Sequence, residues 1–162
     1  MNVIGLGQAG CNIADMFSQH PQYKIYKIDV DIKNDFDFAE QYGELEQTKK
    51  TYNIKQQKGP EEYEKNVPSM KTFFRGVKGE TLFVIGGSGS ISAMCLRIME
   101  QIKDKCEISV LYIRPDTSLL SKNKTLHEKA TYGILQEFAR SGLFKMLYLV
   151  SNINLENILG EV

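Results

Sequence analysis

Short apolar runs recur along the chain and predict the strands of one sheet. In the run YKIYKIDV, Tyr26, Ile28 and Val30 lie on one face of a period-two alternation. The other runs are continuous and are bounded by glycine or polar residues, which is typical of buried strands. The strands predicted in this way span residues 2–6, 23–30, 80–85, 107–113 and 145–150.

Segments with helical spacing separate these runs. The clearest is a continuous stripe at i, i+3, i+4, i+7, i+8 and i+11, which predicts a core-facing helix and consists of Ile91, Met94, Cys95, Ile98, Met99 and Ile102. Weaker patterns predict a helix from Cys11 to the His20-Pro21 pair, one over 61–75 with an interruption near Pro68, and one over 122–140. Residues 31–58 are polar and weakly periodic, so we expect loops there.

Strands that alternate with helices predict an α/β fold. We expect a three-layer architecture, with a mostly parallel, Rossmann-like sheet and helices on both faces. At 162 residues the chain is predicted to be a single domain over 1–162. Residues 155–162 begin what looks like a further helical segment.

Composition narrows the function classes. Hydrophobic residues make up 42% and charged residues 25%, and 20 basic residues balance 20 acidic ones, so bulk charge indicates neither nucleic acid nor a membrane surface as a partner. Three cysteines and two histidines have no metal-site spacing. No apolar stretch approaches the roughly 20 residues of a membrane span. We therefore expect a reduced, cytoplasmic chain without a metal site of its own.

The residues that suggest chemistry follow the predicted strands, where ligands of parallel α/β sheets bind. Gly5, Gly7 and Gly10 fit G-x-G-x-x-G between a strand and an amphipathic helix, and Asp29 lies 19 residues past Gly10, where a ribose-binding carboxylate is expected. This pattern alone favours a nicotinamide or flavin enzyme. Its plainer alternative is a tight strand-helix turn.

A second glycine cluster changes the balance. GGSGS, residues 86–90, lies between a strong strand and the best helix. Glycines let backbone N–H groups approach phosphate oxygens, and the following helix contributes its positive end. The Ser88 and Ser90 hydroxyls would add hydrogen bonds or cap the helix. Two such loops would hold a triphosphate from two sides.

Together these motifs resemble the tubulin and FtsZ superfamily of GTPases. GQAGCN, residues 7–12, looks like the first nucleotide loop of that family, and GGSGS resembles its GGTGSG signature, with Ser88 in place of threonine and Ile91 in place of the last glycine. Weaker matches follow in order along the chain: Asp29-Val30-Asp31 is similar to the second-strand loop, Arg114-Pro115 to the loop beside the ribose, and Val150-Ser151-Asn152 to the strand end that reads guanine.

The resemblance implies GTP or GDP as the ligand, with Mg²⁺ held mainly by the nucleotide. Asp31, or with less support Asp29, would hold Mg²⁺ through water, and the Asn152 amide would read the guanine edge. The nucleotide-binding residues implied are Gly7, Gln8, Ala9, Gly10, Cys11, Asn12, Asp31, Gly86, Gly87, Ser88, Gly89, Ser90 and Asn152.

The resemblance also implies a cytoskeletal filament in which subunits, copies of this chain or of a longer homologue, stack head to tail. In that family an acidic loop of the next subunit completes hydrolysis, and it follows a central helix. The chain ends at Val162, before that helix, which favours a fragment over a naturally short relative. We therefore assign no catalytic residue and expect GTP binding with very slow hydrolysis by this chain alone.

Two alternatives stay open. One is a Rossmann-type NAD-dependent oxidoreductase domain, for which the sequence offers no catalytic residue or substrate domain. The other is a non-hydrolysing structural subunit of tubulin-like fold that has lost tight nucleotide binding, which Ile91 favours.

Overall fold

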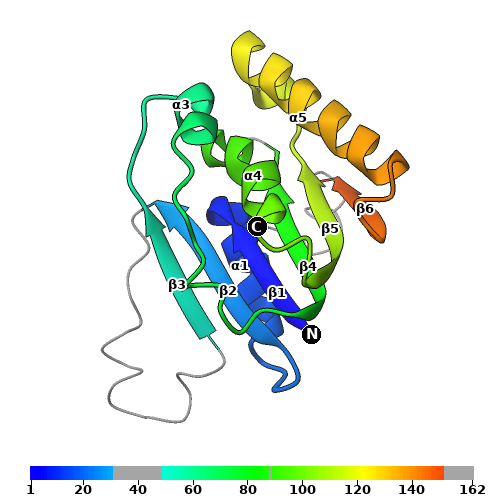
Figure 1. The fold of residues 1–162 in the computed structure, drawn as a ribbon. Coiled ribbons are helices and arrows are strands. Elements are labelled where there is room, and N and C mark those ends of the chain that lie inside the picture. Colours follow the sequence, from blue (N-terminus) through cyan, green and yellow to red (C-terminus); the bar gives the residue numbers. More distant parts are fainter. Residues whose placement is uncertain (31–48, 88, 152–162) are drawn as a thin grey trace.

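A computed structural model describes residues 1–30, 49–87 and 89–151. Six parallel strands form one sheet in the order β3-β2-β1-β4-β5-β6 (Figure 1). The strands are β1 (Asn2–Leu6), β2 (Lys24–Val30), β3 (Lys49–Ile54), β4 (Gly79–Gly86), β5 (Cys106–Arg114) and β6 (Met146–Ser151). The predicted fold class, a Rossmann-like α/β sheet, is confirmed. This strand order also places the topological switch point between β1 and β4.

One strand was not predicted. β3 lies within the polar stretch that was expected to form loops, and it pairs in parallel with β2 at the edge of the sheet. Its sequence KKTYNI offers only Tyr52 and Ile54 as apolar side chains. An edge strand needs few of them, because much of it faces solvent.

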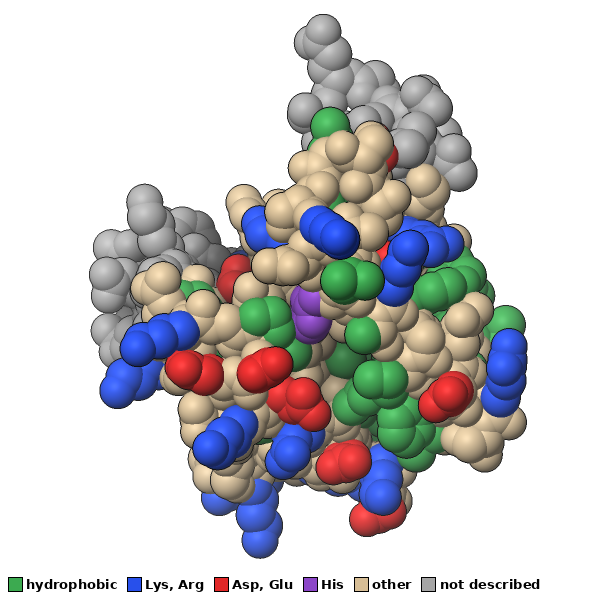
Figure 2. Space-filling view, turned by 90° about the horizontal axis from the view of Figure 1, so that it is seen from above, with side chains coloured by type: hydrophobic (Ala, Val, Ile, Leu, Met, Phe, Trp, Pro, Cys, Tyr) green, Lys and Arg blue, Asp and Glu red, His purple; other side chains and the backbone are tan. Residues whose placement is uncertain are grey.

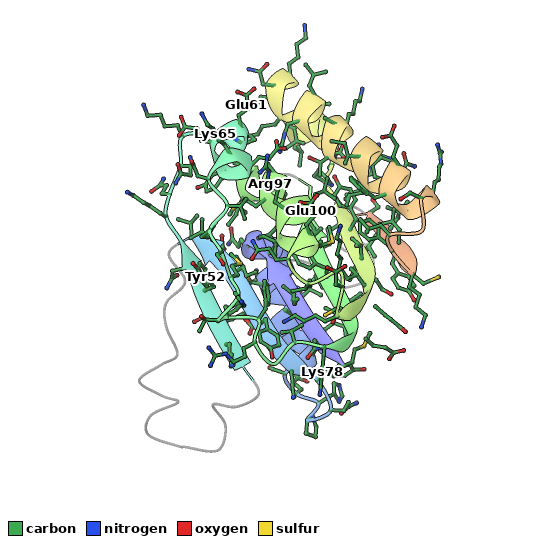
Figure 3. The ribbon with its side chains drawn as sticks, viewed as in Figure 1. Tyr52, Glu61, Lys65, Lys78, Arg97 and Glu100 are labelled. Carbon is green, nitrogen blue, oxygen red and sulfur yellow. The ribbon has the colours of Figure 1, made fainter. Side chains whose placement is uncertain are left out.

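Helices cover both faces of the sheet. α1 (Gly7–Phe17) packs on β1, β2 and β4 from behind, and the other helical segments lie on the opposite face (Figure 1). Those segments are α3 (Pro60–Lys65), η2 (Ser90–Met94), α4 (Cys95–Glu100) and α5 (Lys122–Arg140), while the short η3 (Thr117–Leu119) follows β5. Glu61, Lys65, Arg97 and Glu100 are exposed on the outer surfaces of α3 and α4 (Figure 3).

Two predicted helix boundaries were wrong, and a third helical segment differs in type. α1 begins at Gly7 and not at Cys11, because its first turn is made of small and polar residues that carry no apolar period. The helix predicted over 61–75 ends at Lys65, ahead of Pro68. The segment that carries the apolar stripe begins as the 3₁₀ helix η2 and turns into α4 only at Cys95.

Two apolar layers hold the sheet between its helices. The larger joins the β-strands to α4 and α5 and includes Phe83, Ile85 and Met94, and every member of the stripe over 91–102 is buried in it, as predicted. The smaller lies under α1 and includes Ala14 and Val84. All five residues of β1 are buried, so the strand that leads into the first glycine loop is anchored on both faces.

Candidate functional site

A pocket of about 370 Å³ lies at the switch point, at the carboxyl ends of β1, β2 and β4. Its walls come from both predicted glycine loops and from the end of β2. The lining residues are Leu6, Gly7, Gln8, Ala9, Asn12, Asp29, Gly86, Gly89, Ile91 and Ser92. The fold therefore brings together segments that lie about 80 residues apart in the sequence, as Gly7 and Gly86 show.

The start of α1 opens directly into this pocket. Gly7 is the first residue of the helix and has a φ of 77°, a conformation that disfavours residues with a side chain. The N-cap residue of this helix is Leu6, whose side chain makes no capping hydrogen bond. The first N–H groups of a helix have no partner within it, and they carry the positive end of the helix dipole. Gly7, Gln8 and Ala9 thus present backbone donors that suit an anion.

Gly5 and Gly10 act in packing. A Cβ atom on Gly10 would lie 2.4 Å from the carbonyl oxygen of Val84 in β4, and a Cβ atom on Gly5 would lie 2.4 Å from the carbonyl oxygen of Gly10. Both contacts are with backbone, which cannot rotate away. The glycines therefore allow α1 to lie close against β1 and β4, and that closeness places its first turn beside the loop after β4.

The two glycine loops contact each other. A Cβ atom on Gly86 would lie 3.0 Å from the Ala9 Cβ, and one on Gly7 would lie 3.1 Å from Cγ2 of Ile91. Ile91, which stands where the tubulin-like signature has a glycine, is thus a buried contact of the first loop. The loops form one continuous wall of the pocket.

Ser92 is a pocket residue that the sequence analysis missed. Its side chain is buried, and its hydroxyl donates a hydrogen bond to the carbonyl oxygen of Gly86. The predicted hydroxyl on this helical segment was that of Ser90, which begins η2 and does not line the pocket. Its hydrogen-bond partner lies six residues earlier in the chain, outside the range of local serine motifs, so the sequence carried no signal for this role.

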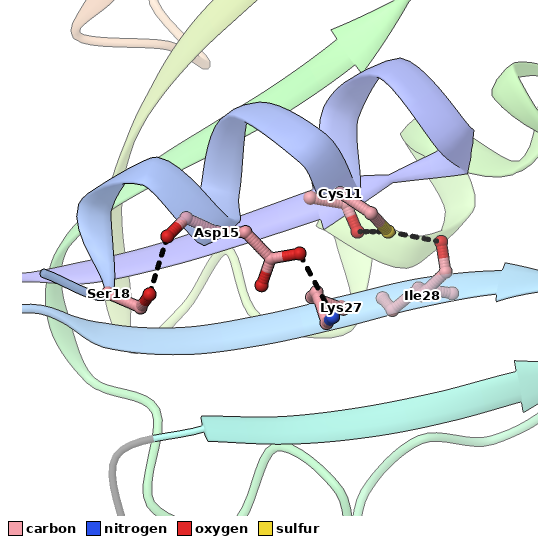
Figure 4. Close-up of polar contacts among 6 residues, drawn as sticks. Cys11, Asp15, Ser18, Lys27 and Ile28 are labelled. Atoms are coloured by element: carbon pink, nitrogen blue, oxygen red, sulfur yellow. Dashed lines mark hydrogen bonds and ion pairs between the residues drawn. The ribbon is translucent and has the colours of Figure 1, made fainter. Parts of the chain in front are cut away.

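Side chains of α1 tie the helix to β2 (Figure 4). The Cys11 thiol donates to the carbonyl oxygens of Gly5 and Ile28, each at 3.5 Å. Burial, helped by the negative charge of Asp29, raises the pKa of Cys11 to about 12, so the thiol stays protonated. Asp15 pairs with the buried Lys27 at 3.1 Å. Cys11 therefore packs α1 against β1 and β2 and lacks the lowered pKa that is typical of a nucleophilic thiol.

The predicted nucleotide-binding residues fall into three groups: those that line the pocket, those that do not, and those outside the described residues. Asp29 lines the pocket at the end of β2, and its Oδ1 accepts a hydrogen bond from the Val30 N–H at 2.7 Å. Asp31, Ser88 and Asn152 lie outside the described residues. The predicted residues that line the pocket are Gly7, Gln8, Ala9, Asn12, Gly86 and Gly89, and those that do not are Gly10, Cys11, Gly87 and Ser90.

The face of the molecule seen in Figure 2 carries charges of both signs. Lys and Arg side chains are interspersed with Asp and Glu around hydrophobic ones, without a large region of one sign. Within the described ranges, no group of three or more His, Cys, Asp or Glu side chains could hold a metal ion. No helix in those ranges is long and apolar enough to cross a membrane.

Comparison with known proteins supports the Rossmann-like fold of the chain. No family model matches the chain, and no curated protein matches it. Among solved structures, a short-chain dehydrogenase/reductase from Burkholderia vietnamiensis is similar, with a TM-score of 0.54 and 12% sequence identity over 93% of this chain and 82% of that one. The chain therefore shares a Rossmann-like fold with that oxidoreductase.

Proposed function

We propose that the chain is a nucleotide-binding domain that holds the phosphates of its ligand at the start of α1. The observation that carries this proposal is the start of α1 at Leu6 and Gly7, where the N-cap side chain makes no capping hydrogen bond and the helix opens into a pocket that the second glycine loop also lines. Backbone donors at a helix N-terminus bind phosphate without a basic side chain. This agrees with the lining that the described residues give the pocket, which includes neither Lys nor Arg.

The first candidate ligand is a dinucleotide such as NAD(H), because it would give a role to the glycines of the first loop and to Asp29. In dinucleotide-binding folds the glycines of G-x-G-x-x-G provide the tight turn, the close approach to phosphate and the close helix packing, and an acid near the end of β2 bonds the ribose. Gly7 and Gly10 fit the second and third tasks, and Asp29 lines the pocket at the end of β2. The similarity to a dehydrogenase/reductase fold supports the same ligand class.

GTP is the second candidate, in a tubulin- or FtsZ-like domain of a filament-forming protein. The observation that favours it is the contact between the two glycine loops, because Gly86 and Gly89 line the same pocket as Gly7. Loops on two sides suit a triphosphate. Three residues of this hypothesis, Asp31, Ser88 and Asn152, lie outside the described residues, and it keeps the expectation of slow hydrolysis without an adjacent subunit.

A titration of the purified chain with NADH, GTP and ATP tests the proposal. Gln8→Glu is the central variant, because it keeps the shape of an exposed side chain and places a negative charge in the first turn of α1. An acid there interacts favourably with the helix dipole, so stability is maintained, whereas phosphate is repelled. We expect affinity to fall at least about tenfold, equivalent to about 1.4 kcal/mol. The matched control is Gln22→Glu, an exposed glutamine at the opposite end of the sheet.

The same titration separates the two ligands. Asp29→Asn is expected to weaken NADH binding by about tenfold or more, since it removes a charged acceptor for the ribose hydroxyls. Asn152→Ala is expected to weaken GTP and leave NADH unchanged. If no nucleotide binds the wild-type chain, or if Gln8→Glu and Gln22→Glu bind equally well, the proposed site is wrong.

A further inference from the structure

A buried polar cluster lies behind the second glycine loop and outside the pocket. Glu128 of α5 is fully buried, and its Oε1 accepts a hydrogen bond from the Tyr112 hydroxyl at 3.0 Å and lies 3.4 Å from Nε of Arg114. Within the described part of the chain, its Oε2 is also buried and has no hydrogen-bond partner. A buried carboxylate is costly, and an apolar replacement is often at least as stable. Its presence therefore calls for a role besides stability.

Tyr112 connects this carboxylate to the loop. A Cβ atom on Gly87 would lie 2.2 Å from the Tyr112 hydroxyl oxygen and 2.8 Å from its Cζ, so the phenol end lies directly against the Gly87 backbone. The Gly87 N–H donates to the carbonyl oxygen of Ile113 at 3.0 Å, which ties the same residue to β5. Gly87 is thus held between a strand and a phenol whose own position Glu128 fixes.

The cluster is rigid because each member has more than one contact. Tyr112 stacks on Tyr132 with ring centroids 5.6 Å apart, and the Arg114 guanidinium lies 4.6 Å from the centroid of the Tyr132 ring. Arg114 supplies a positive charge beside Glu128. Since the carboxylate only accepts, the Tyr112 hydroxyl must donate to it, which fixes the direction of the O–H bond.

From this geometry we infer that Tyr112 and Glu128 are positioning residues, which set the backbone of Gly87 and hence the wall that the second glycine loop gives the nucleotide site. Ser92 bonds the carbonyl of Gly86 from the pocket side, and the phenol of Tyr112 supports Gly87 from behind. The loop is then pre-organised for its ligand, and pre-organisation raises affinity by removing an ordering cost. The last step rests on the proposed nucleotide binding.

Hydrogen exchange in the ligand-free chain tests the hold on the loop. Tyr112→Phe removes the hydroxyl, and Glu128→Gln removes the charge. In both variants we expect the Gly87 amide, followed by NMR, to exchange about tenfold faster than in the wild type. The control is Tyr26→Phe, the same substitution at a buried tyrosine of β2 that packs on Phe73. Unchanged exchange at Gly87 in both variants would overturn the inference.

Nucleotide affinity tests the consequence. Tyr112→Phe and Glu128→Gln should weaken the ligand that binds the wild type by about tenfold, while Tyr26→Phe changes it less than about twofold. If either variant fails to fold, the other is compared with Tyr26→Phe and should bind the ligand about tenfold more weakly than that control. Equal affinity in both would contradict the inference. A wild type that binds no nucleotide refutes the proposed function, and the exchange rate still decides whether Tyr112 holds the loop.

Discussion

Gly10→Ala should destabilise the fold even though alanine is the better helix former. Gly10 lies within α1, where replacing glycine with alanine would by itself stabilise the helix by up to about 1 kcal/mol. The new Cβ atom, however, would lie 2.4 Å from the carbonyl oxygen of Val84 and 3.2 Å from its carbon. An ordinary contact needs about 1 Å more, so α1 must move away from β4 or the strand must bend.

The atom that the new Cβ would meet belongs to the backbone of a buried strand, which cannot rotate away. We therefore expect the destabilisation by overpacking to lie at the upper end of its usual range, about 3 kcal/mol. The net expectation is a loss of roughly 2 kcal/mol, which corresponds to about 4–8 °C in Tm for a chain of this size. Urea denaturation followed by circular dichroism measures it, provided that the slope m is unchanged.

Gly133→Ala provides the opposite expectation in the same assay. Gly133 lies in the interior of α5, and a Cβ atom there meets nothing within 4 Å. It should therefore stabilise the chain by about 0.5–1 kcal/mol through helix propensity alone. If Gly10→Ala proves as stable as the wild type, or if the two substitutions shift stability in the same direction, the close packing of α1 on β4 is not the reason for the glycine.

Two further predictions concern titratable groups. Cys106, which is partly exposed, should react with iodoacetamide at about pH 8 well before Cys11 and Cys95. The reason is that burial raises the pKa of each of the latter two thiols to about 12. Mass spectrometry of the labelled chain measures the order of reaction, and simultaneous labelling of all three cysteines would refute the prediction. Burial lowers the pKa of His127, so as the pH falls through the unfolded value of about 6.5 the unfolded chain takes up a proton that the folded chain resists, and stability falls. Denaturation at about pH 7.5 and about pH 5 should show a smaller loss in His127→Gln than in the wild type, whereas the exposed His20→Gln should match the wild type.

The architecture could be predicted because its signals are local. Apolar runs between turn residues located the strands other than β3, and the stripe over 91–102 located the helical segment that faces the core. β3 was missed because its alternation is short and mostly polar. The start of α1 was missed because a glycine with positive φ is an unusual first helical residue, and only the tertiary packing of Gly10 explains it.

The candidate site was predictable where chemistry follows a strand directly. Both glycine loops and Asp29 were identified because the carboxyl ends of parallel strands lie at one edge of the sheet. Tyr112 and Glu128 had no such signal. They are 16 residues apart, one on a strand and one on a helix, and only the docking of α5 on the sheet brings them together. Ile91 was noted only as a departure from the glycine of the tubulin-like signature, whereas its side chain lies in the space beside Gly7.

The contact between the two glycine loops has a consequence for how this chain can evolve. Gly7 faces Cγ2 of Ile91, and Gly86 faces the Cβ of Ala9, and a Cβ atom added to either glycine would make a contact tighter than an ordinary van der Waals contact. A larger side chain on one loop is therefore tolerated only if its neighbour on the other becomes smaller. Among homologues, positions 9 and 86 should change in pairs, whereas position 7 should stay glycine because of its φ of 77°. A relative with glycine at position 91 would have room beside position 7 that Ile91 occupies in this chain.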